Sequence, residues 1–154
     1  MAGLNAGDVA PEFELADCYG KTVRLSDLRG KKVILYFFTM AGGNNCTRMA
    51  NGYKERAPIL EAKNTVVYGM NDGEPEAARK WIEKENLPFS VLVDSDREVG
   101  IAYRMSAAGS ERYVAWPDEG RRPAVVIDEN GRIAAWEADM NQVVQIDDLI
   151  DRCL

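Results

Sequence analysis

Cys46 is the residue whose type and position point most directly to chemistry. It follows a continuous apolar run at residues 33–38 and a short loop at residues 39–45, and it precedes a segment with helical spacing. A thiol at the start of a helix faces backbone N–H groups and the positive end of the helix dipole. This environment favours the thiolate, which is the nucleophilic form of cysteine. The sequence therefore predicts a reactive thiol at Cys46.

The chain contains no histidine, so no imidazole can activate this thiol. Cysteine proteases and acyltransferases use a histidine base, and their usual mechanism is thereby excluded. The three cysteines, Cys18, Cys46 and Cys153, are widely spaced and form no C-x-x-C pair. This spacing argues against a disulfide framework and a zinc cluster, so we expect reduced thiols, no metal and no cofactor. Reduced thiols and the absence of a secretory pattern at residues 1–8 predict a cytoplasmic protein.

Length and composition indicate one globular domain covering residues 1–154. Hydrophobic residues make up 46% of the chain and charged residues 29%, a balance typical of a globular core. The net charge is −6 and no basic block is present, which argues against nucleic acid as a partner. The longest apolar run is far shorter than a membrane span, so we expect no membrane insertion.

The elements around Cys46 should place it at the end of a buried strand. Residues 33–38 are apolar at every position, as expected of a central strand that is covered on both faces. Further strands are predicted at residues 65–69 and 89–93, and helices at residues 46–62, 74–86, 97–103 and 143–153. In the helix that starts at Cys46, Asn44 or Asn45 is the predicted N-cap, and Pro58 is expected to kink the helix.

Two predicted hairpins flank this alternating region. The first spans residues 12–25 around Tyr19-Gly20, and the second spans residues 124–136 with Asn-Gly in its turn. Residues 104–120 show little periodicity and are expected to form a long loop. Alternating strands and helices imply parallel strands with helices on both faces, and the second hairpin adds antiparallel strands. The sequence therefore predicts an α/β fold with a central mixed sheet flanked by helices.

Three stretches of the chain match a known sequence pattern: residues 7–15 (GDVAPEFEL), residues 20–31 (GKTVRLSDLRGK) with the strand that follows, and residues 122–133 (RPAVVIDENGRI). They resemble peroxiredoxins of the bacterioferritin-comigratory-protein type, within the alkyl hydroperoxide reductase and thiol-specific antioxidant superfamily. The similarity extends over nearly the whole length. It implies a thioredoxin-like fold with an N-terminal hairpin, although a fold alone does not establish an activity.

The resemblance also implies a reaction and the residues that carry it. The family pattern around its peroxide-reducing cysteine is P-x-x-x-T-x-x-C, and residues 39–46 occupy it with Cys46 retained. Arg122 matches the family's later arginine, which stands beside the thiolate. In such enzymes the thiolate attacks a peroxide oxygen and becomes a sulfenic acid as water or an alcohol leaves. A thiol reductant, such as a thioredoxin-like protein or a small thiol, then restores it through a disulfide.

The loop before the cysteine departs from that pattern. Thr39 stands at the proline position and Gly43 at the threonine position, so the hydroxyl that holds the peroxide in the family is missing. The N–H groups of Gly43, Asn45 and Cys46 could still bind an oxygen, and Thr39 or Thr47 could supply a hydroxyl. Loss of one preorganised donor typically costs about 10²–10³-fold in rate. The expected substrate-binding residues are therefore Gly43, Asn45 and Thr39, in a slow peroxidase or in a protein that has lost the activity.

The thiol that would resolve the sulfenic acid is left open. The family's frequent second cysteine, five residues after the first, is Asn51 here. Cys153 is a possible resolving thiol if the C-terminus swings toward Cys46 or reaches a partner subunit. If Cys18 and Cys153 are both idle, the enzyme is of the one-cysteine type, as a monomer or a homodimer. Two alternatives are a redox-inert binding protein on the same fold and, with less support, a thiol–disulfide oxidoreductase, which would need a cysteine at Gly43.

Overall fold

The computed structural model describes residues 3–106, 109, 113–114 and 122–154. The strands are β1 (Glu14–Ala16), β2 (Thr22–Arg24), β3 (Lys32–Phe37), β4 (Thr65–Asn71), β5 (Ser90–Val93), β6 (Ala124–Ile127) and β7 (Ile133–Glu137). The helices are the 3₁₀ turn η1 (Leu25–Leu28), α1 (Asn44–Glu55), α2 (Ala57–Ala62), α3 (Pro75–Glu85), α4 (Glu98–Ala102) and α5 (Val144–Cys153). Among these residues, no helix has the length and apolar character needed to cross a membrane.

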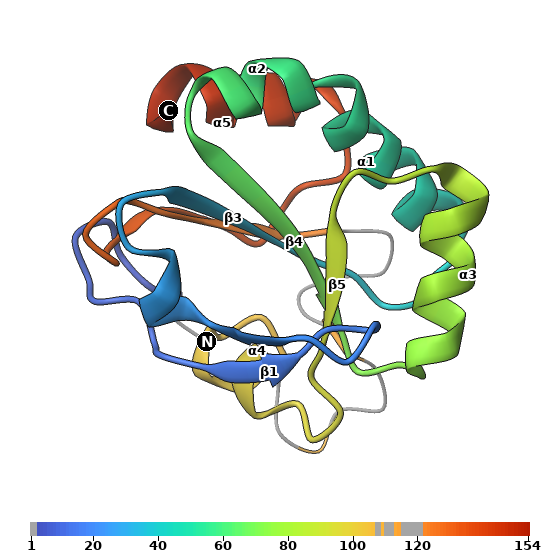
Figure 1. Ribbon diagram of the computed structural model, residues 1–154. Coiled ribbons are helices and arrows are strands. Elements are labelled where there is room, and N and C mark those ends of the chain that lie inside the picture. The colour runs from blue at the N-terminus through green and yellow to red at the C-terminus, as the bar shows by residue number, and fades with distance from the viewer. Residues whose placement is uncertain (1–2, 107–108, 110–112, 115–121) are drawn as a thin grey trace.

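A five-stranded sheet in the order β5-β4-β3-β6-β7 forms the centre of the molecule (Figure 1). β3 pairs in parallel with β4, and β4 pairs in parallel with β5, whereas β6 runs antiparallel to both β3 and β7. β1 and β2 form a separate antiparallel hairpin. The predicted mixed sheet, its central strand and both hairpins are thus confirmed.

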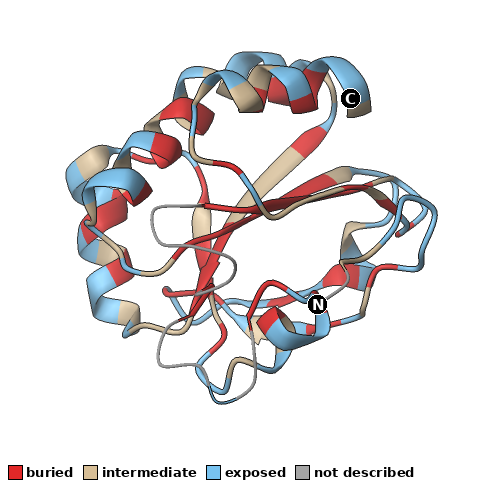
Figure 2. Ribbon diagram, turned by 180° about the vertical axis from the view of Figure 1, so that it is seen from behind, coloured by how far each residue is buried: buried red, intermediate tan, exposed pale blue. Residues whose placement is uncertain are grey.

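Side-chain alternation along β3 divides the core into two layers. Ile34, Tyr36 and Phe38 belong to one buried cluster, and Val33, Leu35 and Phe37 belong to the other. Successive residues of a strand point to opposite faces, which explains why the whole run is apolar. Helices α1, α2, α3 and α5 cover the first face, and the β1–β2 hairpin, η1 and α4 cover the second (Figure 1). The sheet strands are accordingly mostly buried (Figure 2).

The segment after Cys46 is two helices rather than the single kinked helix predicted at residues 46–62. α1 ends at Glu55, Arg56 leaves the helical geometry with φ −98° and ψ 4°, and α2 begins at Ala57. Proline has no N–H to donate, and its ring clashes with the carbonyl four residues earlier. Pro58 therefore interrupts the helix, and it is accommodated in the first turn of α2, where an N–H has no helical partner.

Arg56 connects this helix break to α5 through hydrogen bonds. Its Nη1 donates to the Gly52 carbonyl at 2.9 Å. Its Nε and Nη2 donate to the two carboxylate oxygens of Asp147 on α5, at 2.6 and 2.9 Å. Such a two-pronged pair fixes orientation as well as distance. The α1–α2 corner is thereby held against α5.

Asp147→Asn is expected to destabilise the protein at neutral pH and to have less effect in acid. The hydrogen bonds from Arg56 lower the pKa of Asp147 below its ordinary value of 3.8. A carboxylate whose pKa is lowered by folding stabilises the native state above that ordinary value, and the stabilisation is lost as the pH falls below it. Urea denaturation from pH 7 downward should show the difference between wild type and variant narrowing below about pH 4. Asp151→Asn, at an exposed position of the same helix, is the control. A difference independent of pH would contradict the prediction.

The long loop predicted at residues 104–120 is described only in part. Residues 104–106, 109 and 113–114 lie outside helices and strands. Trp116, Pro117 and Arg121 lie outside the described residues.

Candidate active site

Cys46 lies in the first turn of α1, which follows the central strand β3 after the loop at residues 38–43. The first helical hydrogen bond runs from the Thr47 N–H to the Gly43 carbonyl at 2.8 Å. The N–H groups of residues 44–46 precede that bond, so they remain at the positive end of the helix. The N-cap is Gly43, and the prediction of Asn44 or Asn45 was wrong because the helix begins at Asn44 itself. The Cys46 side chain is completely buried.

Arg122 brings a positive charge to the Cys46 sulfur. Its Nε donates to Cys46 Sγ at 2.8 Å, and the residue is only 8% exposed. The Phe37 N–H donates to the Pro123 carbonyl at 3.0 Å, which continues the pairing of β3 with β6 up to Arg122. The backbone N–H of Arg122 donates to the Met140 carbonyl at 2.6 Å. The side chain of Arg122 therefore places its positive charge directly against the Cys46 sulfur.

The loop before α1 places one hydroxyl and one glycine beside the sulfur. Thr39 Oγ1 lies 3.8 Å from Cys46 Sγ. A Cβ added at Gly43 would lie 3.5 Å from the same sulfur, which is an ordinary contact distance. Thr47 faces elsewhere, because its hydroxyl accepts a hydrogen bond from Trp81 Nε1 at 2.9 Å. Of the two alternative hydroxyls, Thr39 is therefore the one near the sulfur.

Asn45 contributes backbone rather than side chain to this arrangement. Its side-chain oxygen accepts from Arg48 Nη2 at 3.3 Å on the exposed side of α1. Its N–H belongs to the first turn of the helix, together with that of Cys46. The predicted cluster of Cys46, Arg122, Thr39, Gly43 and Asn45 is thus brought together at the start of α1.

Tyr36 supports the first turn of α1 from the sheet below. Its hydroxyl donates to the Cys46 carbonyl at 2.7 Å, and its side chain is fully buried. Burial, followed by the neighbouring Cys46 sulfur, holds the pKa of Tyr36 well above its ordinary value. The phenol therefore stays protonated and remains a hydrogen-bond donor.

In the sequence, Tyr36 is identifiable only as a residue of the buried strand, and Arg48 and Met140 are not identifiable as neighbours of the site. These three residues reach it through contacts of the folded chain. No local pattern in the sequence marks them.

The other two thiols lie away from the sulfur of Cys46. Cys153 ends α5, where the Lys32 ammonium at the start of β3 donates to the neighbouring Leu154 carbonyl at 3.4 Å. Cys46 lies beyond the opposite end of β3, and six strand residues span about 17 Å. Partial burial raises the pKa of the Cys153 thiol, which makes it a poorer nucleophile at neutral pH. Cys18 is buried, with its sulfur 3.9 Å from Ser90 Oγ.

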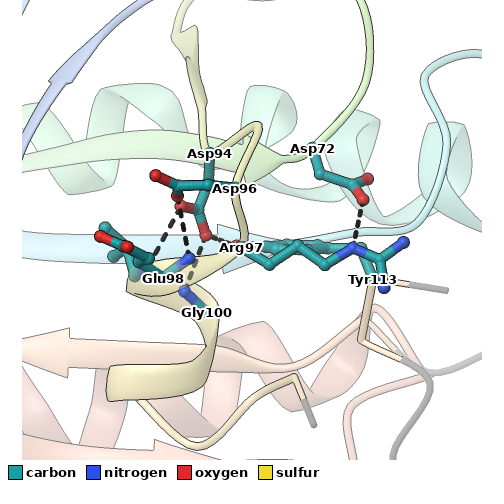
Figure 3. Close-up of polar contacts among 8 residues, drawn as sticks. Asp72, Asp94, Asp96, Arg97, Glu98, Gly100 and Tyr113 are labelled. Atoms are coloured by element: carbon teal, nitrogen blue, oxygen red, sulfur yellow. Dashed lines mark hydrogen bonds and ion pairs between the residues drawn. The ribbon is translucent and has the colours of Figure 1, made fainter. Parts of the chain in front are cut away.

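A second polar cluster surrounds the fully buried Asp94, at the end of β5 (Figure 3). One carboxylate oxygen accepts the Val99 N–H at 3.1 Å, and the other accepts the Gly100 N–H at 2.7 Å and the Tyr113 hydroxyl at 2.8 Å. These hydrogen bonds compensate for the water that the buried carboxylate group lacks. The cluster begins α4 and holds Tyr113 against it, which is a structural role.

A groove of about 430 Å³ opens beside the first half of β4. Its lining includes Tyr53, Glu61, Lys31 and Tyr68, but none of the residues that surround the Cys46 sulfur. Among the described residues, no group of three or more His, Cys, Asp or Glu side chains is placed to hold a metal ion. Compared with the Asp94 cluster and this groove, the arrangement at Cys46 is therefore the one that combines a thiol with a neighbouring cation and a helix start.

Comparisons with known proteins place this site in a family context. The AhpC/TSA family matches residues 6–136. The peroxiredoxin Bcp of Escherichia coli K12 is 33% identical over 134 residues, which cover 86% of this chain and 85% of that protein. Among solved structures, peroxidoxin BcpB of Mycobacterium tuberculosis superposes with a TM-score of 0.84 at 21% identity, covering 97% of this chain and 96% of that one. A mutant of Xylella fastidiosa PrxQ superposes with a TM-score of 0.83 at 16% identity, covering 98% and 96%. The superpositions confirm the predicted thioredoxin-like fold.

Proposed function

The chain belongs to the AhpC/TSA family and is a peroxiredoxin, a thiol-dependent peroxidase, and from that premise we propose that Cys46 is its peroxide-reducing thiol and Arg122 the cation that activates it. The observation that carries the proposal is the contact of 2.8 Å between Arg122 Nε and Cys46 Sγ at the start of α1. A buried thiol without a charged neighbour is usually inert. The guanidinium and the helix start together supply that charge.

The reaction proceeds by displacement at a peroxide oxygen. The Cys46 thiolate attacks one oxygen, the S–O bond forms and the O–O bond breaks, and the departing oxygen leaves as water or an alcohol after taking a proton. Cys46 becomes a sulfenic acid. The guanidinium of Arg122 can stabilise the negative charge as it moves from sulfur to the leaving oxygen. No step requires histidine or a metal.

Substrate binding falls to the loop at residues 39–46. The hydroxyl of Thr39, 3.8 Å from the sulfur, and the N–H groups of Asn45 and Cys46 in the first turn of α1 can hold the two oxygens of a peroxide. The Gly43 N–H is engaged instead, because it donates to the Met40 carbonyl at 3.2 Å.

The resolving thiol comes from outside the chain, so the enzyme is of the one-cysteine type. Cys153 lies at the far end of β3, with a partly buried sulfur, and Cys18 packs against Ser90. A small thiol or a thioredoxin-like protein attacks the sulfenic sulfur, water leaves, and a mixed disulfide forms. A second reductant thiol then releases Cys46.

Intact-mass spectrometry after one equivalent of hydrogen peroxide tests both parts of the proposal. We expect the protein to gain one oxygen on Cys46, and to gain instead the mass of the thiol less two hydrogen atoms when a trapping thiol is present. A Cys46 that stays unoxidised at millimolar peroxide would refute the peroxidase assignment. A disulfide between Cys46 and Cys153 or Cys18 would refute only the one-cysteine mechanism.

We infer further that Gly43 makes the enzyme slower than it could be, and Gly43→Thr is expected to raise the rate of Cys46 oxidation at least about ten-fold. Gly43 has φ −64° and ψ 150°, which any residue adopts, so glycine is not needed for the backbone. An added Cβ would lie 3.5 Å from the sulfur and 3.3 Å from the Met40 carbonyl, which requires only a small shift. A preorganised hydroxyl at such a place is worth about 10²–10³-fold.

Gly43→Val is the matched control, because valine has the shape of threonine without the hydroxyl. It should leave the rate constant unchanged or lower it. Equal effects of threonine and valine, measured by peroxide consumption at saturating reductant, would show that the hydroxyl is not what the site lacks.

A further inference from the structure

The loop between β7 and α5 contacts both parts of the proposed site. The Met140 carbonyl accepts the backbone N–H of Arg122 at 2.6 Å. The next carbonyl, that of Asn141, accepts Nη2 of Arg48 from α1 at 2.7 Å. Two consecutive carbonyls thus join the residue that carries the guanidinium to the helix that carries the thiol. Met140 is itself buried in the core, which fixes the depth of the loop.

One side chain, Gln145 in the first turn of α5, holds this loop in shape. Its Oε1 accepts the N–H groups of Asn141 and Gln142, both at 2.8 Å. Its Nε2 donates to the Asp139 carbonyl at 2.8 Å. Since backbone N–H groups can only donate, the amide oxygen must face Asn141 and Gln142, and its NH₂ group then faces Asp139. Three hydrogen bonds from one amide therefore set the path of residues 139–142.

We propose that Gln145 is a positioning residue for the peroxidase reaction: through the loop at residues 139–142, it keeps the Arg122 guanidinium in register with the Cys46 sulfur. The inference rests on the proposed function of Cys46 and Arg122. Gln145 touches neither the sulfur nor the guanidinium in the contacts above, and it acts by fixing the two carbonyls that hold Arg122 and α1.

The contact that depends on this register is sensitive to small displacements. A charge-assisted hydrogen bond to sulfur requires both a short distance and a favourable angle. Displacement of a reacting group by about 1 Å can cost about 10²-fold in rate. Loosening the loop should therefore reduce catalysis without removing any group that contacts the peroxide.

The first experiment compares Gln145→Ala with Gln142→Ala, a glutamine of the same loop whose side chain is exposed. Gln145→Ala is expected to lower the second-order rate constant for oxidation of Cys46 by between about ten- and a hundred-fold. It should also change the ¹³Cβ chemical shift of Cys46, because the contact of Arg122 with the sulfur is loosened. Gln142→Ala should change neither. A Gln145→Ala rate within two-fold of wild type, or a loss of thermal stability alone, would overturn the proposal.

A second comparison approaches the loop from α1. Arg48→Met removes the donor to the Asn141 carbonyl, and its effect should be coupled to that of Gln145→Ala. The double variant is expected to lose less than the product of the two single losses, whereas strictly multiplicative losses would contradict a shared route through the loop. Gln145→Glu keeps the acceptor oxygen, so it serves as the folded variant if Gln145→Ala does not fold. It should show an intermediate rate, and a rate no better than that of alanine would count against the proposal.

The chemical-shift readout separates this inference from the proposed function. If the wild-type protein does not consume peroxide, the ¹³Cβ chemical shift of Cys46 still reports whether Gln145 keeps Arg122 beside the sulfur. If peroxide is consumed but the Gln145 variants keep the wild-type chemical shift and rate, only the positioning role fails.

Discussion

Replacing Cys46 by serine is expected to reduce peroxide consumption to the uncatalysed rate. A serine hydroxyl at the same place has neither the acidity nor the nucleophilicity of a thiol, and no histidine is present to activate it. The substitution changes little else, because serine is nearly the same size as cysteine and fills the same fully buried position. Peroxide loss at saturating reductant measures the effect directly, and the thermal unfolding temperature checks that the variant is folded.

Cys18→Ser and Cys153→Ser are the matched controls for this loss. Each removes one thiol, and each should retain the wild-type rate with a small-thiol reductant, because neither sulfur lies beside Arg122. If Cys46→Ser still turns over peroxide, another thiol carries the reaction. A loss confined to Cys153→Ser at the reductive step would instead identify it as the resolving thiol.

Arg122→Met is expected to lower the rate constant of oxidation by about 10²–10³-fold, the usual effect of removing one preorganised donor from a transition-state site. Methionine retains much of the length and apolar bulk of the arginine stem, so the buried space stays filled. What is lost is the charge and the Nε donor 2.8 Å from the sulfur. Single-turnover oxidation, followed by quenching and mass analysis, separates this step from reduction.

Two further substitutions distinguish charge from geometry. Arg122→Lys keeps the charge but not the planar donor, and should fall between wild type and Arg122→Met. Arg132→Met removes an arginine that is exposed on the β6–β7 turn, and should leave the rate unchanged. Similar losses from Arg122→Met and Arg132→Met would mean that only the overall charge of the protein matters.

The strands and hairpins were predictable because their signals are local. An apolar run such as residues 33–38 is expected only in a strand that is buried on both faces. The Asn-Gly pair before β7 predicts a tight turn, and Gly131 lies there at φ 78°. The start of α1 was misplaced by a residue or two, since asparagine is favoured at an N-cap yet glycine is also accepted there. Pro58 was recognised as a disruption of the helix. Whether a proline kinks or breaks a helix depends on the contacts that hold its two halves, and here Arg56, between the halves, pairs with Asp147 of α5.

Within the candidate site, Cys46 was indicated by its position at the start of a helix, whereas Arg122 was found only through the family pattern. Cys46 and Arg122 are 76 residues apart, and no periodicity connects them. The Tyr36 hydroxyl and the Gln145 amide act on backbone groups, which any residue can supply, so their partners leave no trace in the sequence. Which threonine lies near the sulfur was decided by Trp81, whose indole engages Thr47.

That indole also gives the protein a built-in optical reporter. Trp81 donates to the hydroxyl of the residue that follows Cys46, and its ring lies 4.9 Å from that of Phe38. Trp136 is bonded to the Tyr103 carbonyl and packs with the opposite layer of the core. A change of charge or volume at Cys46 should therefore alter the emission of Trp81 more than that of Trp136. With Trp81→Phe as the comparison variant, single turnovers can be followed in real time without any added label.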